Sequence, residues 1–168
     1  MPNHITTEVE ISAPKDKIDA LIKKTKIKLD TDVENNEFDF NGILPMPKHS
    51  DTFFAEGGLG SDEKEKYGKN NWYDWSIENW GTKWNAYDVR FTGHSDEKLV
   101  LQIDTAWDTP RGIWKALEKQ GYTVKGVMYG EMEGYDYIGD GSDVFEAYQT
   151  VEVEYVGELK GEDNAASN

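Results

Sequence analysis

Two segments of the chain alternate between inward and outward positions, as strands with one buried face do. In residues 4–11 the inward positions are Ile5, Thr7, Val9 and Ile11, and in residues 98–107 they are Leu99, Leu101, Ile103 and Thr105. Similar alternation in residues 84–94 and 122–133 predicts two further strands. Residues 135–158 are predicted to supply one or two more.

Three other segments have the spacing of helices. In residues 12–24 apolar side chains recur on one face, at Ile18, Leu21 and Ile22. Residues 108–121 are expected to form a helix that is capped by Asp108 or Thr109. In residues 72–80 a single helical face carries Trp72, Trp75, Ser76, Asn79 and Trp80.

This order of elements predicts an α+β fold with a mostly antiparallel sheet and helices on one face. Because a strand followed by a helix occurs twice, the arrangement is expected to be ferredoxin-like. Residues 1–160 would form one domain, with an aromatic-rich helical insertion at about 38–84 and an exposed glycine-rich loop at 55–71. Residues 161–168 would be a disordered acidic tail.

The charge of the chain favours some classes of partner over others. The formal net charge is −15, and the last 47 residues contain eleven acidic residues and two lysines, a net charge of −9. Such a field repels phosphate backbones and attracts basic surfaces, so direct nucleic-acid binding is disfavoured and a basic protein partner is favoured. Acidity also serves solubility, which is its commoner role.

Other simple features lead us to expect a soluble protein of the cytoplasm. The chain has no cysteine, which excludes disulfides, thiolate metal sites and a cysteine nucleophile. Its first residues do not have the basic start and apolar run of a secretory signal. No segment has the roughly 20 apolar residues of a membrane span, so no membrane association is expected.

The segment 71–88 contains four tryptophans and two tyrosines within eighteen residues. In the structural interpretation, which is the commoner one for such spacing, Trp72, Trp75, Trp80 and Trp84 fill the core. In the functional interpretation some of these rings stack on a ligand, with Tyr73 and Lys83 pointing away from the packed face. The candidate ligand-binding residues are Trp72, Tyr73, Trp75, Trp80, Lys83, Trp84 and Arg90.

The acidic residues after Tyr122 form a second candidate site, which would imitate the phosphates of DNA and bind a partner. Its predicted residues, with two tyrosine anchors, are Glu131, Glu133, Asp136, Asp140, Asp143, Glu146, Tyr129 and Tyr135. Asp140, Asp143 and Glu146 form only an incomplete calcium loop, so no metal site is expected. No cofactor motif is present, and His4, His49 and His94 have no catalytic spacing and are expected to be incidental.

Several phrases of the sequence, "MPNH", "FDFNGILPMP", "WYDWSIENWGTKWNAYD" and "DTAWDTP", are characteristic of a known family. On these phrases residues 1–120 resemble the phage and plasmid proteins that carry a YubB-like ferredoxin-like domain. The resemblance implies a ferredoxin-like fold and an origin on mobile genetic elements. It supplies no catalytic residues.

These observations together favour a non-enzymatic phage protein that acts in the cytoplasm of its bacterial host. It would bind and inhibit a basic host defence protein, such as a nucleic-acid-binding effector of the CRISPR or restriction type, through the acidic surface. The alternative hypothesis is a protein that binds a small ligand or nucleotide signal with the tryptophan-rich segment. In that case Lys83 or Arg90 would meet a phosphate group.

Overall fold

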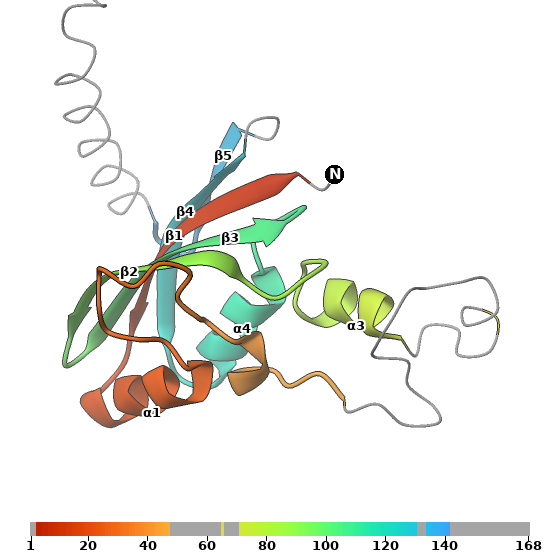
Figure 1. Ribbon diagram of the computed structural model, residues 1–168. Coiled ribbons are helices and arrows are strands. Elements are labelled where there is room, and N and C mark those ends of the chain that lie inside the picture. Colours follow the sequence, from red (N-terminus) through yellow and green to blue (C-terminus); the bar gives the residue numbers. More distant parts are fainter. Residues whose placement is uncertain (1–2, 48–64, 66–70, 131–133, 142–168) are drawn as a thin grey trace, which may run out of the picture.

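The computed structural model describes residues 3–47, 65, 71–130 and 134–141. Its strands are β1 (His4–Ser12), β2 (Tyr87–Ser95), β3 (Lys98–Ala106), β4 (Thr123–Gly130) and β5 (Gly134–Ile138). Its helices are α1 (Lys15–Thr25), the short 3-10 helix η1 (Phe40–Gly42), α3 (Trp72–Asn79) and α4 (Arg111–Lys119). The strands form one antiparallel sheet in the order β2-β3-β1-β4-β5, which confirms the α+β class (Figure 1).

One face of the sheet is covered by α1 and α4, and the hydrophobic core lies between these helices and the strands (Figure 1). The inward positions predicted for β1 and β3 are all fully buried, namely Ile5, Thr7, Val9, Ile11, Leu99, Leu101, Ile103 and Thr105. The helices contribute Ile18, Leu21, Ile113 and Leu117 to the same core. The alternation therefore predicted correctly both the strands β1 and β3 and which of their side chains are buried.

The start of α4 differs from the prediction. Pro110 occupies the N-cap position and makes no capping hydrogen bond, so the expected cap by Asp108 or Thr109 is wrong. Asp108 instead accepts a hydrogen bond from the backbone N–H of Thr109 and another from the Arg111 side chain. The carboxylate thus stabilises the turn before the helix instead of the first helical turn.

The long connection between α1 and β2 also reaches the core. Phe38 and Phe40 are fully buried, and Phe40 packs edge-on against Trp80 with ring centroids 5.5 Å apart. The helix predicted at residues 72–80 is α3, and Asn71 caps it by accepting a hydrogen bond from the backbone N–H of Asp74. Asn71 is therefore part of a buried cap and not of the predicted loop, most of which lies outside the described residues.

The predicted strands beyond β5, residues 55–64 and 66–70 of the predicted loop, and the tail at 161–168 lie outside the residues that the structure describes. Among the described residues, no helix has both the length and the apolar character needed to cross a membrane.

Candidate functional site

The face of the sheet opposite α1 and α4, here called the open face, is mostly polar and aromatic, although Val127 on this face is apolar and buried. Its composition follows from strand pairing, because residues directly opposite each other on neighbouring strands point to the same side. One row across all five strands contains Tyr87, Asp104, Thr6, Tyr129 and Tyr135. The next row contains Arg90, Gln102, Glu8, Val127 and Tyr137.

Three tyrosines gather at the β4–β5 end of these rows, and we call them the tyrosine patch: Tyr129, Tyr135 and Tyr137. Tyr129 and Tyr135 are opposite each other, and the rings of Tyr135 and Tyr137 meet edge to face with centroids 5.9 Å apart. Their exposed fractions are 37%, 57% and 39% respectively. Tyrosine is among the side chains that are enriched at the anchor positions of protein interfaces.

Glu8 lies in the middle of the open face, between Gln102 and Val127. Its neighbour Glu10 forms ion pairs at 3.6 Å with both Lys98 and Lys125, whereas no ion pair of Glu8 is found among the described residues. Burial, together with the charge of Glu10, raises the pKa of Glu8 to about 7. The centre of this face therefore holds a half-buried carboxyl group that changes charge near neutral pH.

Replacing Glu8 with glutamine should stabilise the protein at alkaline pH and not at acidic pH. Below the unfolded pKa of 4.5 the carboxyl group is protonated in both states. As the pH rises towards 7, the unfolded chain loses this proton first, so the wild type loses stability and the loss persists above pH 7. After allowance for solvent screening, we expect a gain of about 1 to 2 kcal/mol for Glu8→Gln at pH 8.

Urea unfolding at pH 4, 6 and 8 measures this difference. The exposed Glu97 in the β2–β3 turn provides the matched control, and Glu97→Gln should change stability by less than about 0.5 kcal/mol at every pH. A gain for Glu8→Gln that is the same at pH 4 and pH 8 would contradict the assignment.

A polar cluster lies at the β2 edge of the open face. The His4 Nδ1 atom is 2.5 Å from the Tyr87 hydroxyl, and Thr6 donates a hydrogen bond of 2.8 Å to Asp104. Burial, with the charges of Asp104 and Asp88, raises the pKa of Tyr87 to about 12, and burial also raises the pKa of Asp104. His4 is exposed, and its contact with Tyr87 makes it part of this polar cluster.

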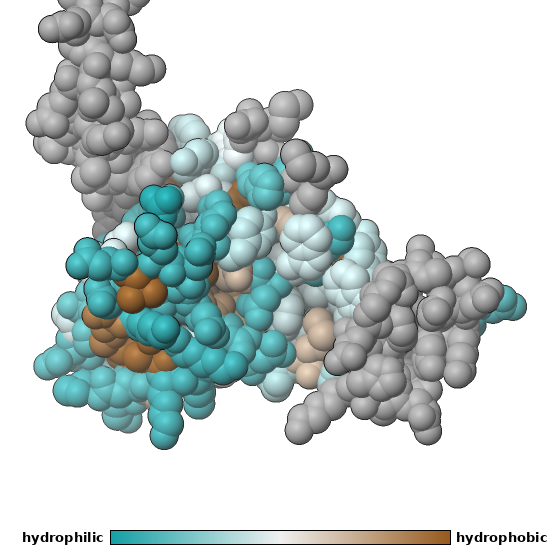
Figure 2. All heavy atoms as spheres, viewed as in Figure 1, coloured by the Kyte–Doolittle hydropathy of each residue, from teal (hydrophilic) through white to brown (hydrophobic). Residues whose placement is uncertain are grey.

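Beside this cluster, a lysine lies against two exposed tryptophans, and we call Lys83, Trp84 and Trp107 the lysine–indole cluster. The Lys83 ammonium group is 4.5 Å from the Trp84 ring centroid and 5.4 Å from the Trp107 ring centroid. The two indoles remain 40% and 41% exposed. Figure 2 shows side chains of intermediate hydropathy, the class of Trp and Tyr, gathered between the sheet and α3.

Further rings extend the lysine–indole cluster on both sides. Tyr73 meets Trp107 edge-on at 5.8 Å, and Trp72 meets Tyr73 at 5.7 Å. On the other side Tyr87 contacts Trp84 at 6.4 Å and His4 at 5.5 Å. The result is a continuous band of aromatic side chains along the surface, with one ammonium group near its middle.

The main chain holds these rings in place. The hydroxyl of Ser76, in α3, donates to the carbonyl of Lys83, and the hydroxyl of Thr82 donates to the carbonyl of Trp84. Trp107 has a φ of 79°, which is unusual for a residue other than glycine, and its N–H donates to the Asn3 carbonyl at 2.9 Å. These bonds fix the main chain at Lys83, Trp84 and Trp107, from which the two indoles extend.

The residues of the predicted ligand site divide between surface and core. Tyr73, Lys83 and Trp84 come together at the surface, so the interpretation of Trp84 as a core residue is wrong. Trp107 completes the arrangement and was missed, because it lies outside the aromatic segment, in the turn after β3. The one feature of the sequence that could have indicated Trp107 is its position directly after an alternating strand, apart from the other aromatic residues.

Two other tryptophans of the segment, Trp75 and Trp80, support the fold, whereas Trp72 is half-buried and meets Tyr73 in the aromatic band. Trp80 is 4% exposed, and its indole N–H donates to the Leu44 carbonyl at 2.8 Å. Trp75 packs against the core and meets Trp80 edge-on at 5.4 Å. The structural interpretation holds for these two. Arg90 belongs to the open face and not to the lysine–indole cluster.

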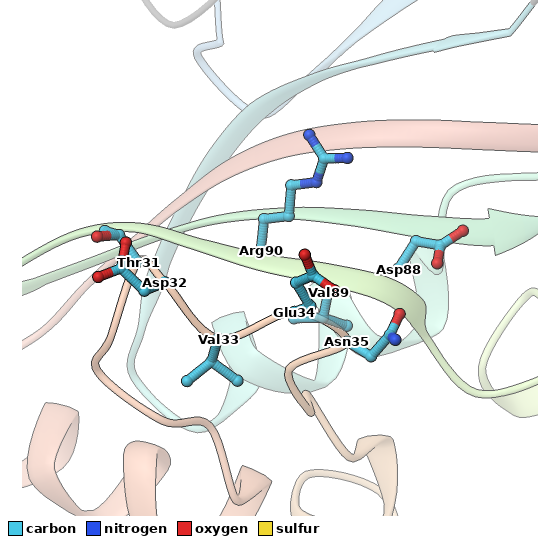
Figure 3. A pocket seen from close by; sticks show the side chains of 8 residues that line it. All are labelled: Thr31, Asp32, Val33, Glu34, Asn35, Asp88, Val89 and Arg90. Atoms are coloured by element: carbon cyan, nitrogen blue, oxygen red, sulfur yellow. The ribbon is translucent and has the colours of Figure 1, made fainter.

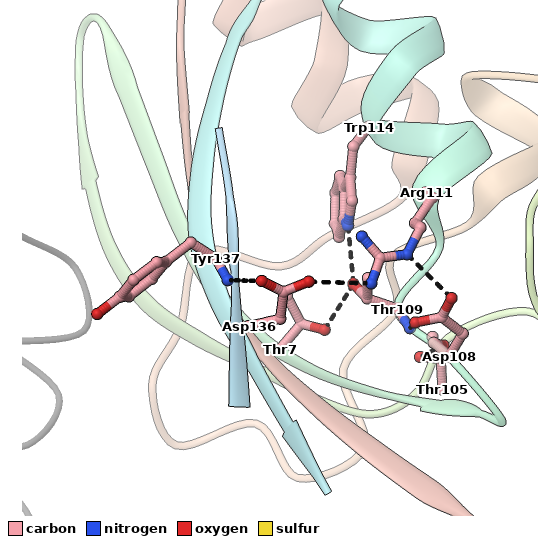
Figure 4. A network of polar contacts seen from close by, with 8 residues as sticks. All are labelled: Thr7, Thr105, Asp108, Thr109, Arg111, Trp114, Asp136 and Tyr137. Carbon is pink, nitrogen blue, oxygen red and sulfur yellow. Dashed lines mark hydrogen bonds and ion pairs between the residues drawn. The ribbon is translucent and has the colours of Figure 1, made fainter. Parts of the chain in front are cut away.

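The predicted partner-binding residues are only partly described. Tyr129 and Tyr135 belong to the tyrosine patch, whereas Glu131, Glu133, Asp143 and Glu146 lie outside the described residues. Asp136 points to the opposite face, where its carboxylate is 3.5 Å from Arg111, while the Tyr137 ring points the other way (Figure 4). Asp140 is exposed at the end of β5. Tyr137 was missed, although its alternation with Tyr135 could have revealed it.

An acidic hollow of about 450 Å³ lies beside β2 and is separate from the aromatic band. Asp32, Glu34 and Asp88 line it, with Arg90 at its rim. The Arg90 side chain points away from Val33 and towards the open face (Figure 3). Among the described residues no group of three or more His, Cys, Asp or Glu side chains has an arrangement that could hold a metal ion.

No protein-family model matches the sequence, and neither the curated proteins nor the solved structures include a significant match.

Proposed function

We propose that the protein is a non-enzymatic binding protein of a phage or other mobile element, which inhibits a host defence protein. The target would be a basic protein of the host cytoplasm, such as a nucleic-acid-binding effector of a CRISPR or restriction system. The acidic residues would imitate DNA, and the tyrosine patch would anchor the partner.

The tyrosine patch is the observation that carries this proposal. Exposing three large aromatic rings side by side to water is unfavourable, and patches of this kind mark interaction sites. The patch lies on β4 and β5, within the part of the chain that carries a net charge of −9. A partner that docks here would meet three aromatic anchors, and the acidity of this part of the sequence would favour a basic partner.

The described polar groups support binding more than catalysis. His4 contacts the Tyr87 hydroxyl, but a phenol with a pKa of about 12 stays protonated at neutral pH and is a poor nucleophile. Asp104 is held by Thr6 and belongs to the same rigid surface. These groups can form hydrogen bonds with the surface of a partner and offset its positive charge, without reacting with it.

The strand order supports the proposed relation to the YubB-like ferredoxin-like proteins. In the order β2-β3-β1-β4, α1 leads towards β2 and α4 connects β3 to β4, which is the arrangement of a split β-α-β fold. On this proposal β5 is an additional edge strand, and the long connection that contains η1 and α3 is the aromatic insertion.

The alternative, a protein that binds a small ligand or nucleotide signal, has a smaller candidate site than the sequence suggested. Trp80 lies in the core and Trp75 packs against it, so neither is available to a ligand. The lysine–indole cluster with Tyr73 remains, and its two exposed indoles are the observation that favours this second candidate.

A plating assay tests the proposed function. The protein is expressed in bacteria that carry one of a panel of restriction or CRISPR systems, and the efficiency of plating of a targeted phage is measured. We expect the wild type to restore plating against at least one system. Combined replacement of Tyr129, Tyr135 and Tyr137 by serine should reduce this protection at least about tenfold, because each anchor is worth 1 kcal/mol or more.

The matched control is Leu29→Ser, which removes an apolar side chain that is 44% exposed elsewhere on the surface. It should protect the phage as well as the wild type does. A second set of variants reverses Glu131, Glu133 and Asp140 to lysine and should also abolish protection; Asp136 is left unchanged because it pairs with Arg111 on the opposite face. Failure of the wild-type protein against the whole panel would contradict the proposal.

A further inference from the structure

The lysine–indole cluster has the components of an aromatic binding site for a cation. The faces of aromatic rings attract ammonium and guanidinium groups, and several rings around one position recognise quaternary ammonium groups. In the folded protein one cation already lies in this position, because the Lys83 ammonium contacts the rings of both Trp84 and Trp107. The protein's own lysine shows which chemistry the site accepts.

The main chain that carries the two indoles is fixed by hydrogen bonds, whereas the ammonium group between the rings can leave. Trp84 and Trp107 are held through main-chain hydrogen bonds from Thr82 and to Asn3. The ammonium group of Lys83 is held by the two cation–π contacts and is connected to the backbone by a flexible chain of four methylene groups. Exchange of Lys83 for another cation would therefore not disturb the main chain that carries the two indoles.

The charge of the protein favours a cationic occupant over an anionic one. The net charge is −15, and Asp104 and Asp88 act on Tyr87, the ring next to Trp84. A phosphate-bearing ligand would have to approach against this field, with one lysine to attract it. A basic side chain would be drawn towards the site.

We propose that the two indoles of the lysine–indole cluster receive a lysine or arginine side chain of the partner protein, and that Lys83 occupies the site until the partner displaces it. This inference rests on the proposed function, because it assumes a basic protein partner. It adds a second contact region, at the opposite edge of the sheet from the tyrosine patch, and names the group that binds there.

The inference can be tested without the partner, by titration with tetramethylammonium chloride against sodium chloride at equal ionic strength. The readout is the set of tryptophan indole N–H signals in a proton–nitrogen NMR spectrum, assigned with Trp84→Phe and Trp107→Phe. We expect the signals of Trp84 and Trp107 to shift in a saturable way, while that of the buried Trp114 does not move. The arginine analogue N-acetylarginine amide should produce the same pattern.

Lys83→Met is the decisive variant, because methionine keeps an unbranched side chain but removes the competing charge. We expect it to bind tetramethylammonium about threefold to tenfold more tightly than the wild type, as expected for the loss of a competing cation–π contact. Trp84→Leu should abolish the shift at Trp107. Unchanged remaining signals in each variant verify that the fold is intact.

Three results would overturn the inference: no shift of either indole signal, equal affinity in the wild type and Lys83→Met, or saturable shifts with adenosine monophosphate and none with the cations. The last result would identify the site as a nucleotide site. Because the titration uses no partner, its failure would leave the plating result of the tyrosine patch intact. A failed plating assay would likewise not change the cation titration.

Discussion

Replacing Gly112 with alanine is expected to destabilise the protein by more than about 3 kcal/mol. Gly112 lies in the first turn of α4, where its N–H donates to the Trp80 carbonyl at 3.1 Å. A Cβ atom at this position would lie 1.7 Å from the Asn79 carbonyl oxygen. Gly112 belongs to the main chain of α4, and Asn79 is the last residue of α3. Neither main-chain segment can shift to relieve this contact without separating α3 from α4.

Urea unfolding measures the loss of stability, and the indole signals of Trp84 and Trp107 report whether the aromatic band is displaced as well. Gly93 in β2 provides the matched control, since its Cβ would meet only the Val100 side chain, at 3.7 Å. Gly93→Ala should change stability by less than about 1 kcal/mol. A Gly112→Ala protein as stable as the wild type would show that α3 and α4 are not closely packed.

Thr109→Val is expected to cost about 2 to 4 kcal/mol, although the two side chains have nearly the same shape. Thr109 is fully buried, and its hydroxyl oxygen accepts a hydrogen bond of 2.9 Å from the Trp114 indole N–H (Figure 4). The same hydroxyl is 2.9 Å from that of Thr7 in β1. Valine would leave both the indole N–H and the Thr7 hydroxyl buried without this partner.

Thr7→Val separates the two contributions, because it leaves the bond between Thr109 and Trp114 in place. Its cost should be smaller, at about 1 kcal/mol, and both variants can be compared by urea unfolding with tryptophan fluorescence as the signal. Equal costs for Thr109→Val and Thr7→Val would show that the indole bond contributes nothing to stability.

The sheet could be predicted from the sequence because its signal is local. The alternation in residues 4–11 and 98–107 reflects the geometry of a strand, in which successive side chains point to opposite faces. The order of strands and helices then gave the α+β class. The cap of α4 was predicted wrongly, because Asp108 is used by its neighbours Thr109 and Arg111 in the preceding turn.

The candidate sites depend on contacts between distant segments, which periodicity does not report. Helical spacing identified α3, but it says nothing of Trp84, which lies beyond the end of the helix. Trp107 follows β3 and meets Lys83 only because the chain folds back. Pairing of β4 with β5 likewise decides that Tyr129 and Tyr135 meet and that Asp136 faces the helices.

The row of paired residues from Tyr87 to Tyr135 has a consequence for how a partner could be held. It connects the edge of the sheet next to Trp84 with the tyrosine patch, across four intervals between strands. At about 4.8 Å for each interval, the two regions are roughly 19 Å apart. A rigid partner that reaches both would gain avidity, since engagement of one end raises the effective concentration at the other. Two individually weak contacts could in this way give slow dissociation.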